Sequence, residues 1–107
     1  MQTQKTNIEN AEGFDWHIGT LAKNMKHGVS LAETEELFLN PPYFVSPDEK
    51  HSIGEFRFTC YGKTTKNRNL VIVFTMRGKR IRVISARDMN KREKKYYEEQ
   101  IKKAASI

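Results

Sequence analysis

The sequence has little of the cysteine that stabilises small secreted domains through disulfides, and it has no long apolar run of the kind that spans a membrane. Cysteine occurs once, as Cys60, so no disulfide can form within the chain. The three histidines, at positions 17, 27 and 51, lack the spacing of a zinc site, and we expect neither a metal nor a cofactor. No apolar run is long enough for a signal peptide or a membrane span. These absences predict a cytoplasmic protein of a reducing compartment.

Positive charge is concentrated in one third of the chain. The 107 residues carry a formal net charge of +6. Residues 1–62 hold 5 Lys and Arg against 9 Asp and Glu, whereas residues 63–95 hold 12 against 2. The net charges of these parts are therefore −4 and +10. Such segregation is typical of a surface that faces phosphates or an acidic protein, and the alternative is a solvated charged face.

Apolar spacing predicts a single α+β domain over residues 14–104, after a flexible arm formed by residues 1–13. Asp15 is a candidate cap for a first helix. One stripe of that helix is expected to face a core and consists of Ile18, Leu21, Ala22 and Met25. A capping box formed by Ser30 and Glu33 is expected to open the second helix.

About four antiparallel strands and a last helix are expected after these two helices. Turn residues and apolar content place the strands at residues 43–45, 55–63, 69–77 and 80–87. The segment 69–77 is the most apolar and is expected to be central and covered on both faces. Within 55–63, alternation groups Phe56, Phe58 and Cys60 on one face. Residues 89–104 are expected to form the last helix, with Asn90 and Glu93 as its capping box.

The run from Arg77 to Arg87 predicts a tight turn followed by a strand with evenly spaced arginines. Side chains alternate between faces along a strand, so Arg80 and Arg82 share one face. Simple alternation places on the opposite face Ile81, Val83, Ser85 and Arg87. One face of this strand is therefore expected to be core, and the other a positive surface.

Several spaced motifs resemble, in order, the pattern of the BrnT toxin family, over roughly residues 14–97. They are Phe14-Asp15-Trp16, Lys26-His27-Gly28-Val29-Ser30, Phe38, His51-Ser52, Glu55, Arg57, Gly62, Arg77 and the run from Ile81 to Arg87. The resemblance implies a RelE-like fold and a bacterial type II toxin–antitoxin system. It also implies a metal-independent ribonuclease that a ribbon-helix-helix antitoxin of the BrnA kind neutralises, with operator DNA bound only through the complex of the two proteins.

RNA cleavage without a metal requires activation of a 2′-hydroxyl, stabilisation of an anionic phosphorane and protonation of the leaving oxygen. Arginine suits the second role, because its planar fork grips phosphate oxygens and keeps its charge. The candidate catalytic residues are Arg57, Arg77, Arg82, Arg87, Glu55, His27 and His51. The candidate RNA-binding residues are Lys26, Arg80, Ser85 and Tyr96.

Each candidate also has a structural reading. The arginines suit ion pairs, and Glu55 suits orientation of an arginine better than base catalysis. Both His27 and His51 suit proton transfer, although His27 at a helix end also suits interaction with the helix dipole. Of Tyr96 and Tyr97, one is expected in the core and the other near the basic face, where it would stack a base.

The rival to the ribonuclease is a binding module without catalysis. In that reading the basic face docks an acidic antitoxin or a nucleic acid. Two apolar residues of the central strand, Val71 and Val73, would face outward and support such docking.

Overall fold

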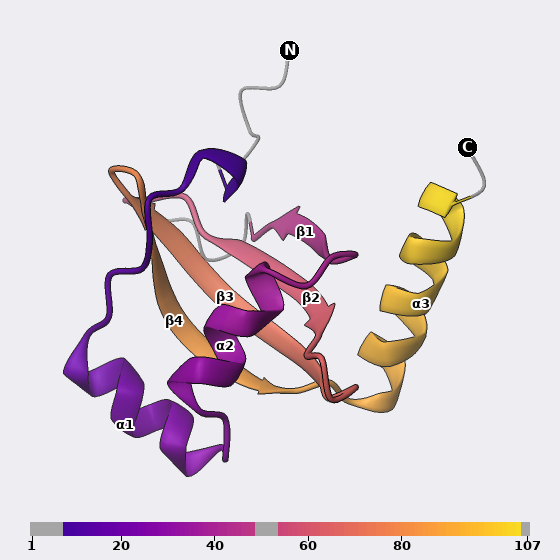
Figure 1. Cartoon of the computed structure of the whole chain (residues 1–107), viewed down its shortest axis with the longest axis horizontal. Helices are drawn as coiled ribbons and strands as arrows, with labels where there is room; N and C mark the ends of the chain where they lie inside the picture. Colours follow the sequence, from indigo (N-terminus) through magenta and orange to yellow (C-terminus); the bar gives the residue numbers. More distant parts are fainter. Residues whose placement is uncertain (1–7, 49–53, 106–107) are drawn as a thin grey trace.

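The computed structural model describes residues 8–48 and 54–105 (Figure 1). In chain order, the elements are η1 (Ile8–Asn10), α1 (Ile18–Lys26), α2 (Leu31–Phe38), β1 (Phe44–Pro47), β2 (Phe58–Lys63), β3 (Asn69–Arg77), β4 (Arg80–Asp88) and α3 (Lys91–Ala105). The strands form one antiparallel sheet in the order β1-β2-β3-β4. The α+β class is confirmed, with its two N-terminal helices, four-stranded sheet and C-terminal helix. No helix in the described ranges is both long and apolar enough to span a membrane.

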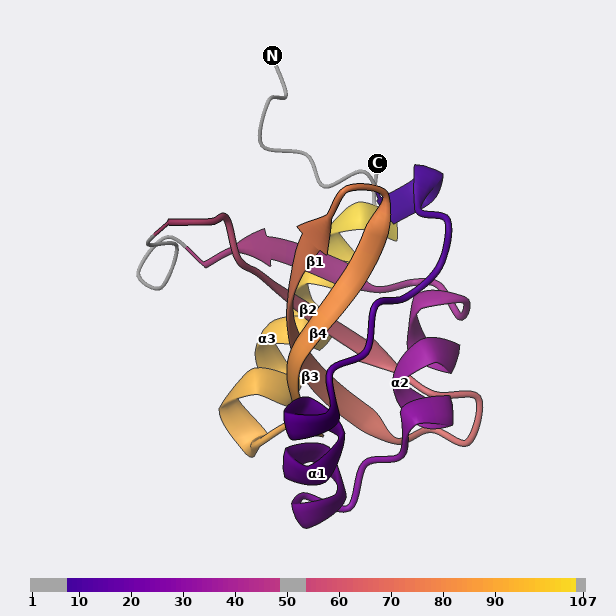
Figure 2. The same cartoon turned by 90° about the vertical axis from the view of Figure 1, so that its left-hand side faces the viewer.

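The sheet lies between helices on its two faces. Figure 2 shows α2 on one side and α3 on the other, and α1 lies beside β4. On the α2 side, Leu37 and Phe38 pack into a cluster with Phe74 and the other buried residues of the sheet. On the α3 side, the ring of Tyr96 contacts residues of β1 and β2. Burial of the hydrophobic residues of α2 and the sheet therefore forms the main core between them.

The prediction that β3 is covered on both faces is confirmed. Ile72 is fully buried on the α2 side, and its neighbour Val71 is 3% exposed on the opposite side. The expectation that Val71 faces outward and supports docking is therefore wrong. Half-buried Val73 is the more accessible of the two valines.

Both capping boxes are confirmed. The Glu33 backbone N–H donates to Ser30 Oγ (3.0 Å), and the Ser30 backbone N–H donates to Glu33 Oε1 (3.0 Å). At the start of α3, the Glu93 N–H donates to Asn90 Oδ1 (2.8 Å), and the Asn90 N–H donates to Glu93 Oε1 (3.0 Å). These side chains satisfy backbone N–H groups that have no partner within the helix.

Two expectations for the first helix are wrong. Asp15 does not cap α1, because the Gly19 N–H donates instead to the His17 ring at Nδ1 (3.1 Å). The apolar stripe does not face a core along its length, since Ile18 is 82% exposed and Ala22 is exposed. The reason is that α1 lies against the edge strand β4, so the first turn of this helix points to solvent.

The expected strand 55–63 begins later, at Phe58. Phe56 is 68% exposed and does not share the buried face of Phe58 and Cys60. Its carbonyl accepts a hydrogen bond from the Thr75 hydroxyl (2.6 Å) rather than continuing the ladder of the sheet. The alternation rule fails here because residues 55–57 lie before the paired part of β2.

The N-terminal segment runs along the free edge of β4. The Gly13 carbonyl accepts from the Ile81 N–H (2.9 Å), and the Asp15 N–H donates to the Ile81 carbonyl (2.9 Å). Phe14 forms a parallel bridge with Ile81, and both Ile8 and Ala11 pack against the core. Residues 8–13 of the expected arm are thus hydrogen-bonded to, or packed against, the domain, and residues 1–7 lie outside the described residues.

An irregularity in β4 decides which of its side chains share a face. Val73 pairs with Ser85 but Phe74 pairs with Val83, so Ile84 is an extra residue in β4. This β-bulge shifts the alternation by one position. The four residues Arg80, Arg82, Ser85 and Arg87 consequently lie on one face, opposite to the buried Ile81, Val83 and Ala86. The prediction that Ser85 and Arg87 share a face with Ile81 is therefore wrong.

We predict that Gly62→Ala destabilises the fold, because Gly62 is where α2 packs most closely on the sheet. A Cβ atom there would lie 2.7 Å from Leu37 Cδ2 and 3.1 Å from Tyr43 Cβ. Overpacking of this kind costs about 1–3 kcal/mol. Thermal unfolding measures the loss against Leu39→Ala, which alters a side chain that is 80% exposed. Equal melting temperatures for the two variants would contradict the prediction.

Candidate functional site

The sheet face that carries the β4 arginines is organised in rows of paired residues. We call it the arginine face, and it comprises the side of the sheet opposite to α2. Its first row consists of Phe44, Tyr61, Val71 and Arg87. The second row consists of Ser46, Thr59, Val73 and Ser85. The third row contains Thr75 and Arg82, and the fourth Arg77 and Arg80. Successive rows lie about 6.7 Å apart, because side chains return to a face every second residue.

Arg57 extends the third row. It directly precedes β2, and because Phe58 pairs with Phe74, Arg57 comes level with Thr75 and hence with Arg82. Arg57 is half-buried, and its carbonyl accepts from the Asp48 N–H (2.8 Å). Two guanidinium groups from non-adjacent strands therefore flank the same residue of β3.

Three arginines of this face have a nearby carboxylate as an ion-pair partner. Arg77 Nη2 lies 3.8 Å from Glu55 Oε2, and Arg82 Nη2 lies 3.2 Å from an oxygen of Asp15. Arg87 donates to both carboxylate oxygens of Glu93 at 2.7 Å. These arginines therefore form ion pairs and also lie on one face of the sheet. The arginines share a surface, but Arg87 lies two rows, or about 13 Å, from Arg82 along the strand direction.

Arg82 has hydrogen-bonding capacity beyond its ion pair. Its side chain is 28% exposed, and Asp15 contacts it through Nη2. Its Nε is buried and has no hydrogen-bond partner among the described residues. A buried donor without an acceptor costs free energy, and the exposed part of this guanidinium is the part that an anion can reach. Arg82 is therefore suited to receive a phosphate oxygen.

The Arg87 end of the face is more tightly bonded. The bidentate hydrogen bonds from Glu93 raise the pKa of Arg87, and the same bonds from Arg87 hold the pKa of Glu93 below its usual value. Burial raises the pKa of the nearby Tyr61 phenol, and the negative charge of Glu93 raises it further. Both Arg87 and Glu93 are therefore fully charged at neutral pH.

The other predicted site residues lie at several places. Arg80 is exposed at the start of β4, and Ser85 is half-buried at the centre of the arginine face. Tyr96 is the tyrosine near this face, being 36% exposed, whereas Tyr97 is buried and donates its hydroxyl to the Pro42 carbonyl (2.8 Å).

Of the histidine and lysine candidates, only the side chain of His27 is described by the structure. His27 is exposed after the end of α1. No hydrogen bond or ion pair within residues 8–48 and 54–105 links His27 to the face. Lys26 is the last residue of α1, and its side chain lies outside the described part of the structure. His51 also lies outside the described residues, in a segment whose neighbours Asp48 and Glu55 contact Arg57 and Arg77.

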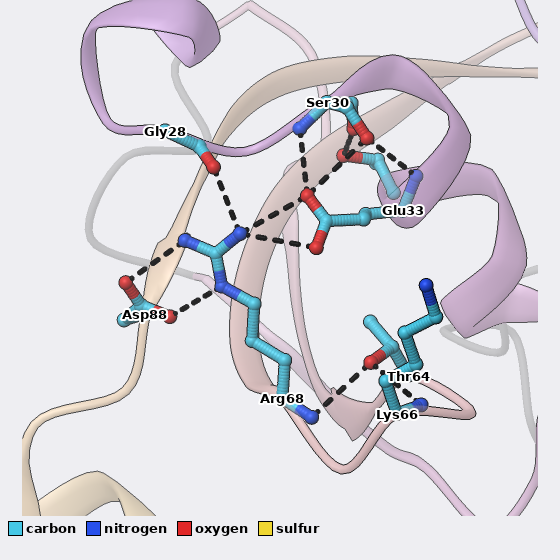
Figure 3. A network of polar contacts seen from close by, with 8 residues as sticks. Gly28, Ser30, Glu33, Thr64, Lys66, Arg68 and Asp88 are labelled. Carbon is cyan, nitrogen blue, oxygen red and sulfur yellow. Dashed lines mark hydrogen bonds and ion pairs between the residues drawn. The ribbon is translucent and has the colours of Figure 1, made fainter.

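Sequence reasoning missed Arg68, which bonds to three separate segments of the described structure (Figure 3). Its Nε and Nη2 donate to Asp88 at the end of β4 (2.8 and 3.1 Å). Its Nη1 donates to the Gly28 carbonyl (2.8 Å) and to both carboxylate oxygens of Glu33 (3.0 and 3.1 Å). One side chain thus joins the α1–α2 connection, α2 and the sheet. No local signal in the sequence indicates this role, since the partners of Arg68 lie 20 to 40 positions away.

Asp15 and Glu93 were also missed as partners of the arginines. Sequence reasoning treated both as helix caps, and only Glu93 is one. Within the described ranges, no group of three His, Cys, Asp or Glu residues is placed to hold a metal ion.

The fold and the arginine face define a small α+β protein with a sheet surface suited to polyanions. The family described as ribonuclease toxin, BrnT, of type II toxin–antitoxin systems matches residues 16–93. The chain belongs to this family, which the motif resemblance had predicted. A ribonuclease toxin of this kind has an RNA substrate and an antitoxin partner. No curated protein matches the chain.

We predict that unfolding free energy falls in acid because the folded state lowers the pKa of three carboxyl groups. The hydrogen bond from the Ser30 backbone N–H lowers the pKa of Glu33. Arg68 lowers the pKa of Asp88, and Arg87 lowers the pKa of Glu93. Their stabilisation is present above the ordinary values of 4.5 and 3.8, and is lost as pH falls through the lower folded values. Thermal melts should be flat above about pH 5 and decline below it.

The variant Arg68→Ala tests the part of this stabilisation that depends on Arg68. We expect it to cost about 2 kcal/mol at pH 7, since it removes hydrogen bonds to two carboxylates. It should also flatten the acid limb of the stability profile. The control Lys66→Ala changes an exposed side chain in the same turn. If the two variants lose equal stability and keep the wild-type acid limb, the role assigned to Arg68 is wrong.

Proposed function

We propose that this chain is a metal-independent endoribonuclease whose arginine face holds the phosphate that is attacked. The observation that carries the proposal is the gathering of four arginines, Arg57, Arg77, Arg80 and Arg82, in two neighbouring rows of this face. Arg57 lies level with Arg82 across Thr75, so a phosphate at this position would meet guanidinium groups from two sides. Neighbouring Arg77 and Arg80 add positive charge in the next row.

The proposed reaction is an internal transfer at phosphorus. The 2′-oxygen forms a bond to the adjacent phosphorus, the bond from phosphorus to the 5′-oxygen breaks, and a cyclic phosphate remains. The 2′-hydroxyl loses its proton to a base, and the leaving 5′-oxygen gains a proton. The arginines stabilise the extra negative charge of the phosphorane, since their charge persists at any working pH.

The remaining candidates have supporting roles in this proposal. Glu55 lies 3.8 Å from Arg77 and orients it. His27 and His51 are the candidate proton carriers, because histidine is the residue type that commonly serves as a general acid or base. Arg87 binds a further phosphate, and the RNA strand is contacted by Lys26, Arg80, Ser85 and Tyr96.

We infer that the antitoxin is a ribbon-helix-helix protein of the BrnA kind and that the two proteins meet in the cytoplasm. The toxin would reach operator DNA only as part of that complex. Exposed apolar side chains on α1 and α2 support a protein partner on that side of the molecule. These side chains are Ile18, Leu31 and Leu39.

The alternative is a basic binding module without catalysis. The observation that favours it is the set of ion pairs on the arginine face, since Glu55, Asp15 and Glu93 already neutralise three arginines. In that case the face would dock an acidic antitoxin or a nucleic acid and leave RNA intact.

The decisive measurement is cleavage of RNA by the purified chain in EDTA. We expect cleavage to persist, and Arg82→Ala to lower the rate by about a hundredfold or more, as loss of a group that stabilises an oxyanion does. Arg82→Lys should also cleave RNA more slowly than the wild type, because lysine keeps the positive charge but lacks the planar guanidinium that bonds two phosphate oxygens. Lys103→Ala, which removes a positive charge at the exposed end of α3, is the matched control. Absence of cleavage by the wild type, or its complete loss in EDTA, would overturn the proposal.

Expression in growing cells separates the enzyme from the binding module. We expect growth arrest with the wild type and growth with Arg82→Ala, provided that the variant keeps its melting temperature and still binds the antitoxin. The arrest should also be relieved by His27→Gln or His51→Gln, whichever residue carries the proton. Absence of arrest with the wild type would favour the binding module, and arrest that survives Arg82→Ala unchanged would show that the toxicity does not depend on Arg82.

A further inference from the structure

Three aromatic rings meet on the arginine face, and the proposed function uses one of them. Phe44 from β1, Tyr61 from β2 and Tyr96 from α3 contact one another. The ring centroids of Tyr61 and Tyr96 lie 5.3 Å apart, and those of Phe44 and Tyr96 lie 5.6 Å apart. Phe44 and Tyr61 are half-buried, and Tyr96 is 36% exposed. We call this group the ring corner.

The angles between the rings give the group its shape. Phe44 and Tyr61 lie side by side on the sheet with an interplanar angle of 35°. The ring of Tyr96 stands steeply against both, at 78° and 68°. The rings of Phe44 and Tyr61 therefore lie along the sheet, and the ring of Tyr96 stands at a steep angle to them and is exposed to solvent. A flat heterocycle placed here would meet a π-face on one side and apolar surface beneath it.

Charged groups border the ring corner. Phe44, Tyr61 and Arg87 belong to the same row of the arginine face. Glu93, which binds Arg87 at 2.7 Å, precedes Tyr96 by one turn of α3. Arg87, whose Nη1 and Nη2 are bonded to Glu93, thus lies with its remaining donors beside aromatic rings able to stack a base. This pairing of features is how proteins bind single-stranded nucleic acid.

We propose that the ring corner is a nucleobase subsite and that the RNA substrate is single-stranded where it binds. The inference rests on the proposed function and extends it. A base stacks on Tyr96, its phosphate lies at Arg87, and the phosphate that is attacked lies two rows away at Arg82. A base within a duplex is stacked on both faces and cannot enter this corner. Stacking accepts every base, so the subsite contributes affinity and register rather than strict sequence choice.

The structural alternative is that Tyr96 only anchors α3 to the sheet. Two substitutions distinguish these roles. Tyr96→Phe keeps the π-face and the apolar contact, and Tyr96→Leu keeps an apolar contact but has no π-face. An anchoring role predicts similar behaviour from the two variants at equal melting temperature, whereas a stacking role predicts a difference.

The experiment uses the full chain and a short single-stranded oligodeoxynucleotide that contains one 2-aminopurine. This probe lacks the 2′-hydroxyl, so it is not cleaved and reports binding alone. We expect its fluorescence to be quenched on binding to the wild type and to Tyr96→Phe. We expect Tyr96→Leu to bind about tenfold more weakly and to lose the quenching. The probe annealed to its complement, in which base stacking already lowers the fluorescence, should bind with no further decrease.

The outcomes separate this proposal from the nuclease proposal. Equal binding and quenching for Tyr96→Leu and Tyr96→Phe would overturn the subsite, whether or not the chain cleaves RNA. A further decrease in the fluorescence of the duplex probe on addition of the protein would overturn it as well. If Tyr96→Leu alone loses binding while the wild type cleaves no RNA in EDTA, the subsite stands and the nuclease proposal fails.

Discussion

The extra residue in β4 is the constraint on which the arginine face depends. Antiparallel pairing forces strict alternation, and the core requires Ile81, Val83 and Ala86 on the buried side. Regular alternation cannot satisfy that requirement, since Val83 and Ala86 are three positions apart. The bulge at Ile84 resolves the conflict and, by the same shift, moves Ser85 and Arg87 to the face of Arg82. The burial that stabilises the sheet thus also assembles its positive surface.

The carboxylates among these arginines have a physical reason. Like charges on neighbouring strands repel, and Asp15, Glu55 and Glu93 each reduce that repulsion in a different row. They also fix long side chains that would otherwise sample many rotamers, which lowers the entropy cost of binding a ligand. The bidentate Arg87–Glu93 contact is the most ordered of the three, whereas the longer Arg77–Glu55 contact leaves its arginine half exposed. A polyanion therefore meets arginines that are already oriented to different degrees.

Much of the architecture could be predicted because it depends on local chemistry. The capping boxes at Ser30 and Asn90, and the central strand 69–77, follow from signals a few residues long. The site could be predicted only in part. Residue type suggested the arginines, but the sequence has no signal for the bulge at Ile84, since an extra residue shows only in the pairing with β3. The network of Arg68 and the contact between Asp15 and Arg82 depend on tertiary placement for the same reason.

The segment that covers β4 has a consequence for the solution behaviour of the protein. An open strand edge is a template for association with another chain, and residues 12–15 occupy this one with backbone hydrogen bonds at Lys79 and Ile81. The opposite edge is β1, which is four residues long and ends in Pro47, a residue without a backbone donor. Neither edge of the sheet is therefore open for pairing with a strand of another chain, which fibril growth and strand exchange require. A protein with so basic a sheet surface can therefore stay dispersed, because both edges of its sheet are closed to pairing with a second chain.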